Sequence, residues 1–241
     1  MGRQRLDVVL VGRGLASTRE QARGLIMGGA VRVEGRPASK PGMQIPEQSA
    51  VEVAAPPPFV GRGGSKLAHA LDVFGATVAG LTGLDVGAST GGFTDCLLQR
   101  GAVRVYAVDV GYGQLDYRLR TDPRVVVWER VNARYPLQLP EPVDIATVDV
   151  SFISLELVLP SIVAELKPGG RIVALVKPQF EIGKGKVGKG GVVRDANLHA
   201  EVLSRIVNWV VDHRLRIEGL TPSPLLGDAG NREFLLGLKR E

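Results

Sequence analysis

The sequence predicts an α/β protein, in which helices cover both faces of an open, mostly parallel sheet and a small α+β unit comes first. Three observations predict this fold. Apolar segments of strand length alternate with amphipathic segments from residue 59 onward. A glycine-rich turn at 87–92 joins one such strand to a helix. A proline-rich run at 54–58 separates this pattern from the residues before it.

The first 53 residues have the pattern of a separate α+β unit. Apolar residues recur at helical spacing from Leu6, and Ser17 or Thr18 is placed to cap a second helix. Segments 31–33 and 51–53 alternate like short strands. This unit carries eight Lys and Arg residues against five Asp and Glu residues, so its surface is basic.

A series of short motifs runs through this basic unit. The motifs are Arg5-Leu6-Asp7, Gly14-Leu15-Ala16, Thr18-Arg19, Ala22, Leu25-Ile26, Gly29-Ala30-Val31 and Val33-Glu34-Gly35. Together they resemble the alpha-L RNA-binding domain of a small-subunit ribosomal protein and of many pseudouridine synthases. The resemblance implies that Arg3, Arg5, Arg19 and Arg23 bind RNA phosphates. The alternative is that these arginines form an ordinary solvated face.

The pattern divides the chain into three parts. Residues 1–53 form the predicted RNA-binding domain, 54–60 form a semi-rigid proline-rich linker, and 61–241 form the larger domain. In the larger domain the last two strands are expected to pair antiparallel. The expected helices are 65–74, 93–99, 114–120, 153–166 and 195–213, and the expected strands are 82–86, 104–109, 125–128, 143–149, 171–177, 214–221 and 233–239.

The glycine-rich turn at 87–92 predicts a site for a nucleoside-containing cofactor. Glycine has no Cβ, so the backbone of such a turn can approach a ligand closely. The helix that follows begins with free N–H groups. Asp109 ends the next strand about 20 residues later, where a carboxylate can accept hydrogen bonds from a ribose.

Two features favour S-adenosylmethionine as that cofactor. The alternative is a nicotinamide cofactor, and the protein would then be an oxidoreductase. Ser89 stands two residues after Gly87, so the turn lacks the G-x-G-x-x-G pattern of dinucleotide-binding proteins. The Leu-Lys-Pro-Gly-Gly segment at 166–170, before a strand, resembles methyltransferases that use S-adenosylmethionine. The predicted cofactor-binding residues are Asp85, Gly87, Ala88, Ser89, Gly91, Gly92, Phe93, Asp109, Asn132 and Asp149. For Asn132, a turn-forming role is the alternative.

Four polar residues stand at positions that converge in a doubly wound sheet. Asp149 and Lys177 end predicted parallel strands, and the carboxyl ends of such strands meet at one edge. Glu233 opens an antiparallel strand and therefore lies at the same edge, while Lys66 begins a helix. Any one of them alone is more simply interpreted as a surface charge. All four together predict a site.

Lys66, Asp149, Lys177 and Glu233 resemble the Lys-Asp-Lys-Glu tetrad of the FtsJ-type ribose 2′-O-methyltransferases. With the alpha-L unit, the chain resembles the TlyA family, whose members are often named haemolysins. The resemblance implies a Rossmann-like methyltransferase domain that methylates a cytidine ribose of ribosomal RNA, with ribosomal subunits as partners. Gly61 departs from the family, which often has serine there.

The resemblance leaves the role of Lys177 open between two possibilities. The lysine either removes the proton of the 2′-hydroxyl or only holds that hydroxyl in line with the methyl group. A glycine- and lysine-rich segment at 183–191 follows the same strand. Its Lys184, Lys186 and Lys189, together with Arg62, are predicted to bind RNA, with a solvated loop as the alternative. No metal is expected, because the three histidines share no metal-ligand spacing.

Composition excludes several other classes of protein. A single cysteine, Cys96, excludes an internal disulfide and a cysteine-based zinc site. No apolar run reaches the ~18 residues that span a bilayer, and no hydrophobic region follows the first residues, so a cytoplasmic protein is expected. The net charge of +5 suits a polyanionic partner. We expect a monomer or weak dimer. The alternatives are a non-catalytic RNA- or ribosome-binding protein and a membrane-active haemolysin.

Overall fold

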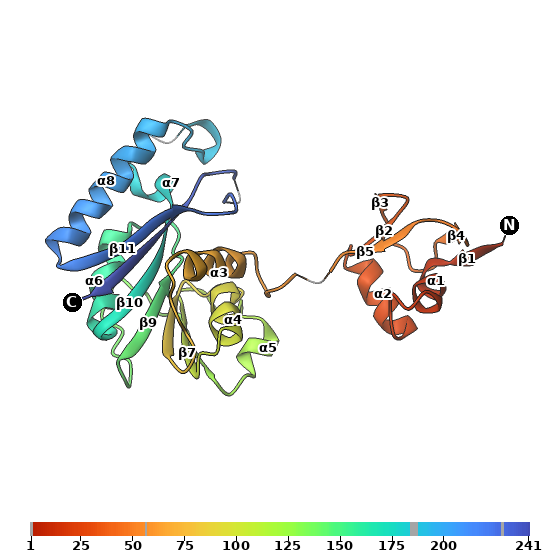
Figure 1. Cartoon of the computed structure of the whole chain (residues 1–241), viewed down its shortest axis with the longest axis horizontal. Coiled ribbons are helices and arrows are strands. Elements are labelled where there is room, and N and C mark those ends of the chain that lie inside the picture. The colour runs from red at the N-terminus through yellow and green to blue at the C-terminus, as the bar shows by residue number, and fades with distance from the viewer. Residues whose placement is uncertain (1, 56, 184–187, 228) are drawn as a thin grey trace. The chain divides into compact units, whose positions relative to one another are not determined.

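A computed structural model describes residues 2–55, 57–183, 188–227 and 229–241. The chain divides into two compact units, Met1–Pro57 and Pro58–Glu241, each of which is described by itself (Figure 1). The proposed domain limits at 53 and 61 stay predictions.

The small unit places two helices and two small sheets around one core. Helices α1 (Leu6–Gly12) and α2 (Arg19–Met27) share this core with strands of both sheets. As predicted, Thr18 caps α2: its Oγ1 accepts a hydrogen bond from Gln21 N (3.1 Å), and Gln21 Oε1 accepts one from Ser17 N (2.7 Å). The strands are β1 (Arg3–Arg5) paired with β4 (Gln44–Pro46), and β2 (Val31–Val33) paired with β3 (Arg36–Pro37) and β5 (Val51–Val53).

The large unit contains a seven-stranded sheet with the order β11-β12-β10-β9-β6-β7-β8. The five strands from β10 to β8 are mutually parallel, and β12 lies antiparallel to both β10 and β11. This confirms the predicted α/β class with a terminal antiparallel pair. The strands are β6 (Thr82–Val86), β7 (Arg104–Asp109), β8 (Val125–Glu129), β9 (Val143–Val148), β10 (Leu166–Val176), β11 (Leu215–Pro222) and β12 (Phe234–Arg240).

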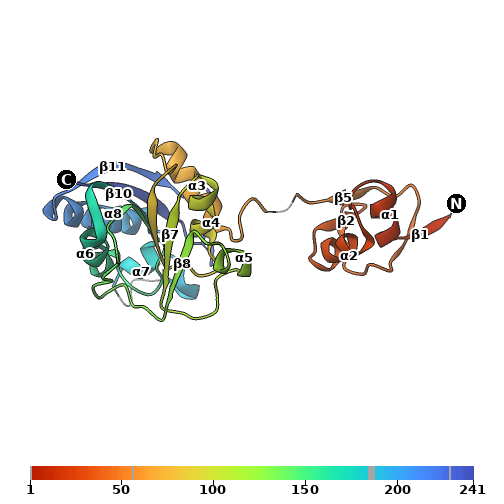
Figure 2. The same cartoon turned by 90° about the horizontal axis from the view of Figure 1, so that it is seen from below.

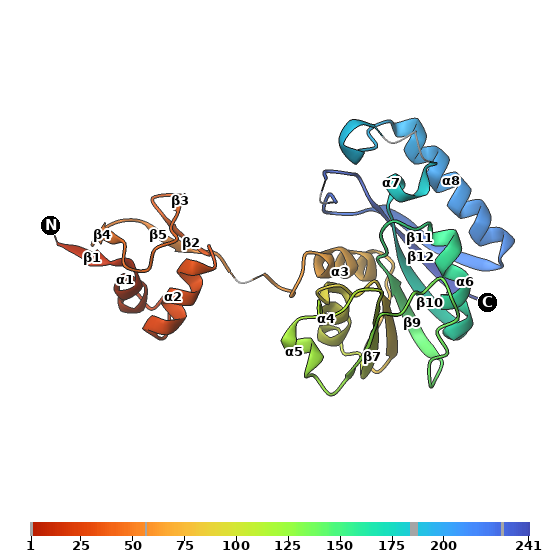
Figure 3. The ribbon, with the colours of Figure 1, turned by 180° about the vertical axis from the view of Figure 1, so that it is seen from behind.

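Helices cover both faces of this sheet because its strands are apolar on both sides (Figures 2 and 3). In β7, Tyr106 and Val108 belong to the core under α6 and α8, whereas Val105 and Ala107 belong to the core under α3 and α4. The helices are α3 (Gly63–Val73), α4 (Gly92–Gln99), α5 (Tyr117–Arg120), α6 (Leu155–Glu165), α7 (Pro178–Glu181) and α8 (Ala196–Asp212), with a 3-10 turn η1 (Lys189–Gly191).

Several elements differ from their predicted limits. Strand β10 begins at Leu166, five residues early, because Leu166 pairs with Val143 before a register shift at the Lys-Pro-Gly-Gly turn. Helix α5 is only four residues long. Strands β1, β3 and β4 and helix α7 were not predicted, since segments of two to four residues carry too little periodicity to be recognised.

Cys96 lies in the core of the large unit, fully buried, and burial raises the pKa of its thiol to about 12. This favours a packing role over a reactive one, because the reactive form of cysteine is the thiolate. Among the described residues no group of three or more His, Cys, Asp or Glu side chains is arranged to hold a metal ion. In the same part of the chain, no helix has both the length and the apolar character needed to cross a membrane.

Candidate active site

The glycine-rich turn follows β6 and lies against the end of β9. The backbone N–H groups of Gly87 and Ala88 both donate to Val108 O, at 2.8 and 3.1 Å, so the turn is tied to β7. Gly87 has a φ of +85°, and a Cβ there would lie 2.3 Å from Asp149 O. Only glycine fits at this position, because a side chain would clash with the β9 backbone.

Two adjoining cavities open at this turn. The first, which we call the apolar cavity, has a volume of about 510 Å³, and the second, the polar cavity, has a volume of about 280 Å³. Gly87, Ser89, Asp149 and Ser151 line both, so the two cavities meet at the carboxyl ends of β6 and β9. A volume of several hundred Å³ is typical of a small-molecule site.

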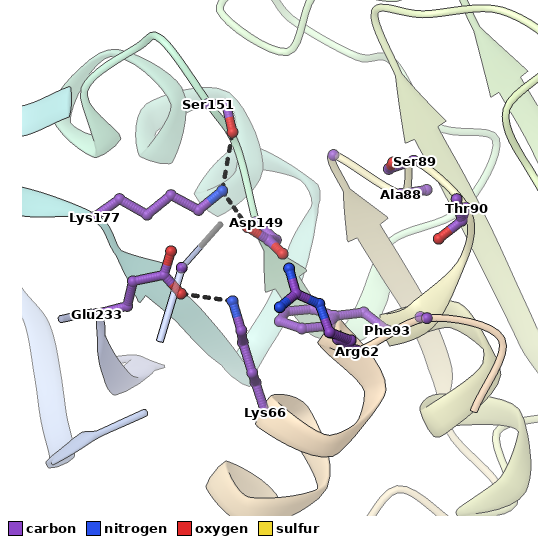
Figure 4. A pocket seen from close by; sticks show the side chains of 15 residues that line it. Arg62, Lys66, Ala88, Ser89, Thr90, Phe93, Asp149, Ser151, Lys177 and Glu233 are labelled. Carbon is purple, nitrogen blue, oxygen red and sulfur yellow. Dashed lines mark hydrogen bonds and ion pairs between the residues drawn. The ribbon is translucent and has the colours of Figure 1, made fainter. Parts of the chain in front are cut away.

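The polar cavity brings together the four residues of the predicted tetrad (Figure 4). Lys66 Nζ from α3 lies 2.6 Å from Glu233 Oε2, and Lys177 Nζ lies 2.6 Å from Asp149 Oδ1. Both lysine side chains are only about one-tenth exposed, at 11% and 12%. The site therefore consists of two lysine–carboxylate pairs from four separate elements, with no net charge among them.

The loop after Asp149 contains two site residues that the sequence interpretation missed. Lys177 Nζ donates a hydrogen bond of 2.9 Å to Ser151 Oγ. Phe152 is 90% exposed, lines the apolar cavity and has a φ of +63°. A positive φ is costly for an aromatic residue, so the surrounding contacts must hold this loop in place. The sequence contains one signal for these two site residues: a serine and an aromatic residue follow the predicted site carboxylate Asp149 within three positions.

Asp109 and Asn132 both line the apolar cavity, as expected for a nucleoside site. Asp109 accepts hydrogen bonds from Ser89 N (2.8 Å) and Gly111 N (2.6 Å), which orient its carboxylate at the mouth of the turn. Asn132 Oδ1 accepts a hydrogen bond from Arg134 N (3.0 Å), so Asn132 also has the turn-forming role that was its alternative.

Two predicted cofactor contacts lie outside both cavities. Asp85 is 0% exposed and lies beneath the turn, where it accepts hydrogen bonds from Thr94 Oγ1 (2.7 Å) and Thr147 Oγ1 (2.9 Å). Burial raises the pKa of Asp85 to about 6. At Gly91 a Cβ would lie 2.2 Å from Leu119 Cδ1, so this glycine serves packing against α5. Direct contact of either residue with a cofactor stays a prediction.

The remaining predicted cofactor residues lie where a ligand can reach them. Ala88, Gly92 and Phe93 line the polar cavity beside the tetrad. Gly87, Ser89 and Asp149 line both cavities.

The predicted RNA-binding residues fall into three groups. Arg3, Arg19 and Arg23 are exposed on the small unit, and Arg5 is half-buried there. Arg5 and Arg19 both pair with the buried carboxylate of Asp7, at 2.9 and 3.1 Å, and these guanidinium groups lower the pKa of Asp7 to about 2. Arg62 lines the polar cavity and points toward Asp149 (Figure 4). Lys184 and Lys186 lie outside the described residues, as does the side chain of Lys189.

Comparison with known families identifies the class of protein. Residues 59–240 match the family described as FtsJ-like methyltransferase, and residues 4–51 match the S4 domain. The chain therefore belongs to the FtsJ-like methyltransferases and carries an S4 domain, the family to which alpha-L-type RNA-binding domains belong.

Relatives of similar length identify the family more narrowly. The chain is 48% identical over 243 residues to the 16S/23S rRNA (cytidine-2′-O)-methyltransferase TlyA of Mycobacterium tuberculosis, covering 99% of this chain and 91% of that protein. It is 40% identical to Hemolysin A of Brachyspira hyodysenteriae, covering 96% of this chain and 98% of that protein. The chain belongs to the TlyA family.

Solved structures agree with this assignment. A candidate hemolysin from Streptococcus thermophilus, 43% identical, superimposes with a TM-score of 0.76 and covers 100% of this chain and 89% of that one. An S-adenosylmethionine-dependent methyltransferase from Mesorhizobium loti, 18% identical, covers 75% of this chain and 100% of that one, with a TM-score of 0.53. The second likeness concerns the fold alone, which is that of S-adenosylmethionine-dependent methyltransferases.

Proposed function

We propose that this protein transfers a methyl group from S-adenosylmethionine to the 2′-hydroxyl of a cytidine in ribosomal RNA. The observation that carries the proposal is the meeting of two lysine–carboxylate pairs with a nucleoside-sized cavity at Asp149 and Ser151. The choice of ribosomal RNA and of cytidine rests on the relative from Mycobacterium tuberculosis.

The residues of the apolar cavity suit the adenosine part of the cofactor. Valine, isoleucine and alanine side chains provide an apolar surface for a base, while Asp109 and Asn132 provide acceptors for a ribose and for an adenine amino group. Gly87 lines both cavities, and the polar cavity beside Asp149 suits the charged methionine part of the cofactor. When bound, the cofactor supplies a methyl group on a sulfonium sulfur, which keeps the electron pair of the carbon–sulfur bond after transfer.

The tetrad supplies the remaining chemistry in this proposal. Lys177 acts in its neutral form: two N–H groups face Asp149 and Ser151, and the lone pair of Nζ accepts the proton of the 2′-hydroxyl at the junction of the two cavities. Lys66 and Glu233 hold each other in the polar cavity and orient the ribose. The alternative role for Lys177, holding the hydroxyl in line without taking its proton, predicts a smaller loss on substitution.

RNA binding is assigned to basic groups on both units. The S4 domain presents Arg5 and Arg19 as an oriented pair, because the buried Asp7 carboxylate fixes both guanidinium groups. Arginine forks of this kind suit phosphate oxygens. Arg62 is placed to bind a phosphate of the nucleotide whose ribose enters the polar cavity. Bases can stack on the exposed ring of Phe152.

The test uses purified full-length protein, tritiated S-adenosylmethionine and both ribosomal subunits from cells that lack this protein. We expect label in ribosomal RNA, at a 2′-O-methylated cytidine located by mass spectrometry of nuclease fragments. Lys177→Ala should lower kcat by about 10³-fold as a lost general base, with cofactor Kd unchanged. Lys239→Ala, at the far end of β12 from Glu233, is the matched control and should retain full activity.

Three outcomes would contradict the proposal. If the wild-type protein binds the subunits but transfers no methyl group, the non-catalytic RNA-binding alternative is correct. If Lys177→Ala keeps near-normal turnover, the lysine is not the catalytic group. If label enters a base instead of a ribose, the assignment of the acceptor is wrong.

A further inference from the structure

Two loops at the carboxyl edge of the sheet lie side by side and are joined at three points. The first loop, 149–154, follows β9, and the second, 177–181, follows β10. Lys177 bonds to Ser151, the Phe152 and Phe180 rings lie 4.8 Å apart, and Ser154 Oγ donates to Glu181 Oε2 at 2.7 Å. We call these segments the loop pair.

Glu181 anchors the far end of the loop pair. Its side chain is nearly buried and accepts a second hydrogen bond, from Leu155 N at 2.8 Å, at the start of α6. Arg205 from α8 neutralises it with an ion pair of 2.7 Å. A buried carboxylate with a cation and two further donors is a stable anchor. The end of the loop pair that carries Lys177 and Ser151 is therefore built on a fixed base.

The Lys177 amine has two partners, which make different contributions. Asp149 Oδ1 lies 2.6 Å away as an ion-pair partner, but it has no well-aligned hydrogen-bond donor among the described residues. Ser151 Oγ accepts an aligned hydrogen bond of 2.9 Å. A charge attraction is weakly directional, whereas a hydrogen bond constrains the angle. Ser151 is thus the partner that sets where the amine points.

Ser151 also lies where the two cavities meet, which is where the orientation of the Lys177 amine matters. It lines both cavities, together with Asp149, while Lys66, Arg62 and Glu233 line the polar cavity with Lys177 (Figure 4). An amine nitrogen has four tetrahedral positions, one of which is occupied by its own side chain. Asp149 and Ser151 face two of the remaining positions of Lys177 Nζ. The fourth position is left for a group that enters the polar cavity.

We propose that Ser151 is a positioning residue of methyl transfer, which holds the Lys177 amine so that its remaining position faces the ribose 2′-hydroxyl. This inference rests on the proposed function. In the step concerned, the hydroxyl proton passes to Lys177 Nζ. The hydroxyl oxygen bonds to the methyl carbon, and the electron pair of the broken carbon–sulfur bond stays on sulfur. Ser151 gains and loses no proton in this step.

The kinetic test compares Ser151→Ala with Ser151→Thr. Misplacing a catalytic group costs about 10²-fold, so Ser151→Ala should lower kcat by about that factor while KM for ribosomal subunits and cofactor Kd stay within about twofold. Ser151→Thr keeps the hydroxyl and should recover most of kcat. Ser204→Ala, an exposed serine on α8, is the matched control and should be neutral.

A second measurement does not depend on activity. Trace acylation of lysines, read by mass spectrometry of peptides, reports how freely each amine moves. Ser151→Ala should raise the labelling rate of Lys177 severalfold and leave that of Lys66 unchanged, since Lys66 is equally buried but pairs with Glu233. If wild-type protein methylates nothing, the proposed function fails, and labelling still decides the Ser151 contact.

The proposal is overturned by any of three results. The first is full kcat in Ser151→Ala. The second is a fall in kcat that Ser151→Thr does not recover, which would mean that the hydroxyl is not the group concerned. The third is unchanged Lys177 labelling in Ser151→Ala. Glu181→Gln weakens the anchor without touching Lys177, so it should lower thermal stability more than Ser151→Ala does.

Discussion

Each unit of this protein contains a completely buried aspartate, and the two have opposite properties. Asp7 in the small unit has two arginine partners, and its pKa falls to about 2. Asp85 in the large unit accepts hydrogen bonds from the hydroxyls of Thr94 and Thr147, and burial raises its pKa to about 6. The two pKa shifts have opposite sign, because hydrogen bonds from cations favour the charged carboxylate of Asp7, whereas deep burial favours the neutral acid at Asp85.

The opposite pKa shifts of Asp7 and Asp85 correspond to different structural roles. Asp7 is buried, yet the side chains of Arg5 and Arg19 that it orients are 41% and 58% exposed. Its charge is therefore used to present cations at the surface of an RNA-binding domain. Asp85 joins β6, β9 and α4 directly under the glycine turn. Its role is internal, since it holds in place the elements on which the cofactor site is built.

The largest expected effect is a pH dependence of the large unit that comes from Asp85. A carboxyl whose pKa is raised on folding binds its proton more tightly in the folded state, so stability is lost as pH rises through about 4 to 6. A shift of about two units corresponds to about 3 kcal/mol between pH 4 and pH 8. Urea unfolding followed by tryptophan fluorescence measures this unit alone, because both tryptophans, Trp128 and Trp209, lie in it.

Asp85→Asn should remove that pH dependence, since the amide does not titrate. The variant is expected to gain stability relative to wild type at pH 8 and to lose that gain at pH 4. A stability difference between wild type and Asp85→Asn that does not change from pH 4 to pH 8 would show that Asp85 is charged at little cost, and the contrast with Asp7 would disappear.

Asp7→Asn should destabilise the small unit by about 1–2 kcal/mol at pH 7, which is less than the pKa shift implies because solvent screens both exposed guanidinium groups. A lowered pKa means that this stability is present above about pH 4 and is lost as pH falls toward 2. Hydrogen exchange of peptides from α1 and α2 measures the effect locally. Protection that is equal in variant and wild type at pH 7 would contradict it.

Thr94→Val should cost about 1 kcal/mol at pH 7, where Asp85 is charged and loses one of its two hydroxyl donors. The same loss should raise the pKa of Asp85 further, because this hydrogen bond favours the charged form. The pH midpoint of the stability curve is expected to move upward. A midpoint that moves downward would mean that Thr94 stabilises the neutral acid instead.

The smallest expected effect separates orientation from net charge in RNA binding. Asp7→Asn adds one positive charge to the small unit but releases Arg5 and Arg19 from their common anchor. If orientation matters, affinity for ribosomal subunits should fall about threefold despite the added charge. A filter-binding titration at constant salt distinguishes the effect of orientation from that of net charge. Asp72→Asn of the large unit is the charge-matched control. Tighter binding by both variants would show that charge alone decides.

Much of the site was predictable because it depends on topology. Asp149 and Lys177 follow parallel strands, and Glu233 precedes an antiparallel one, so any sheet of this class brings them to one edge. Asp85 was predicted to bind the cofactor because an acidic residue beside a glycine turn suggests a ligand contact, but the structure buries it beneath the turn. Side chains alternate along a buried strand, and this alternation turns Asp85 away from the face of Leu84 and Val86, toward Thr94.

The sequence by itself determined the fold class, the family and the edge at which the tetrad gathers, since periodicity, glycine turns and strand ends are local properties of the chain. Only the tertiary structure decided which lysine meets which carboxylate and that Ser151 holds Lys177. The contacts of Lys177 depend on the register of β9 against β10, and the Lys66–Glu233 pair depends on the packing of α3 against β12. Both result from the packing of segments far apart in sequence, and no local pattern encodes them.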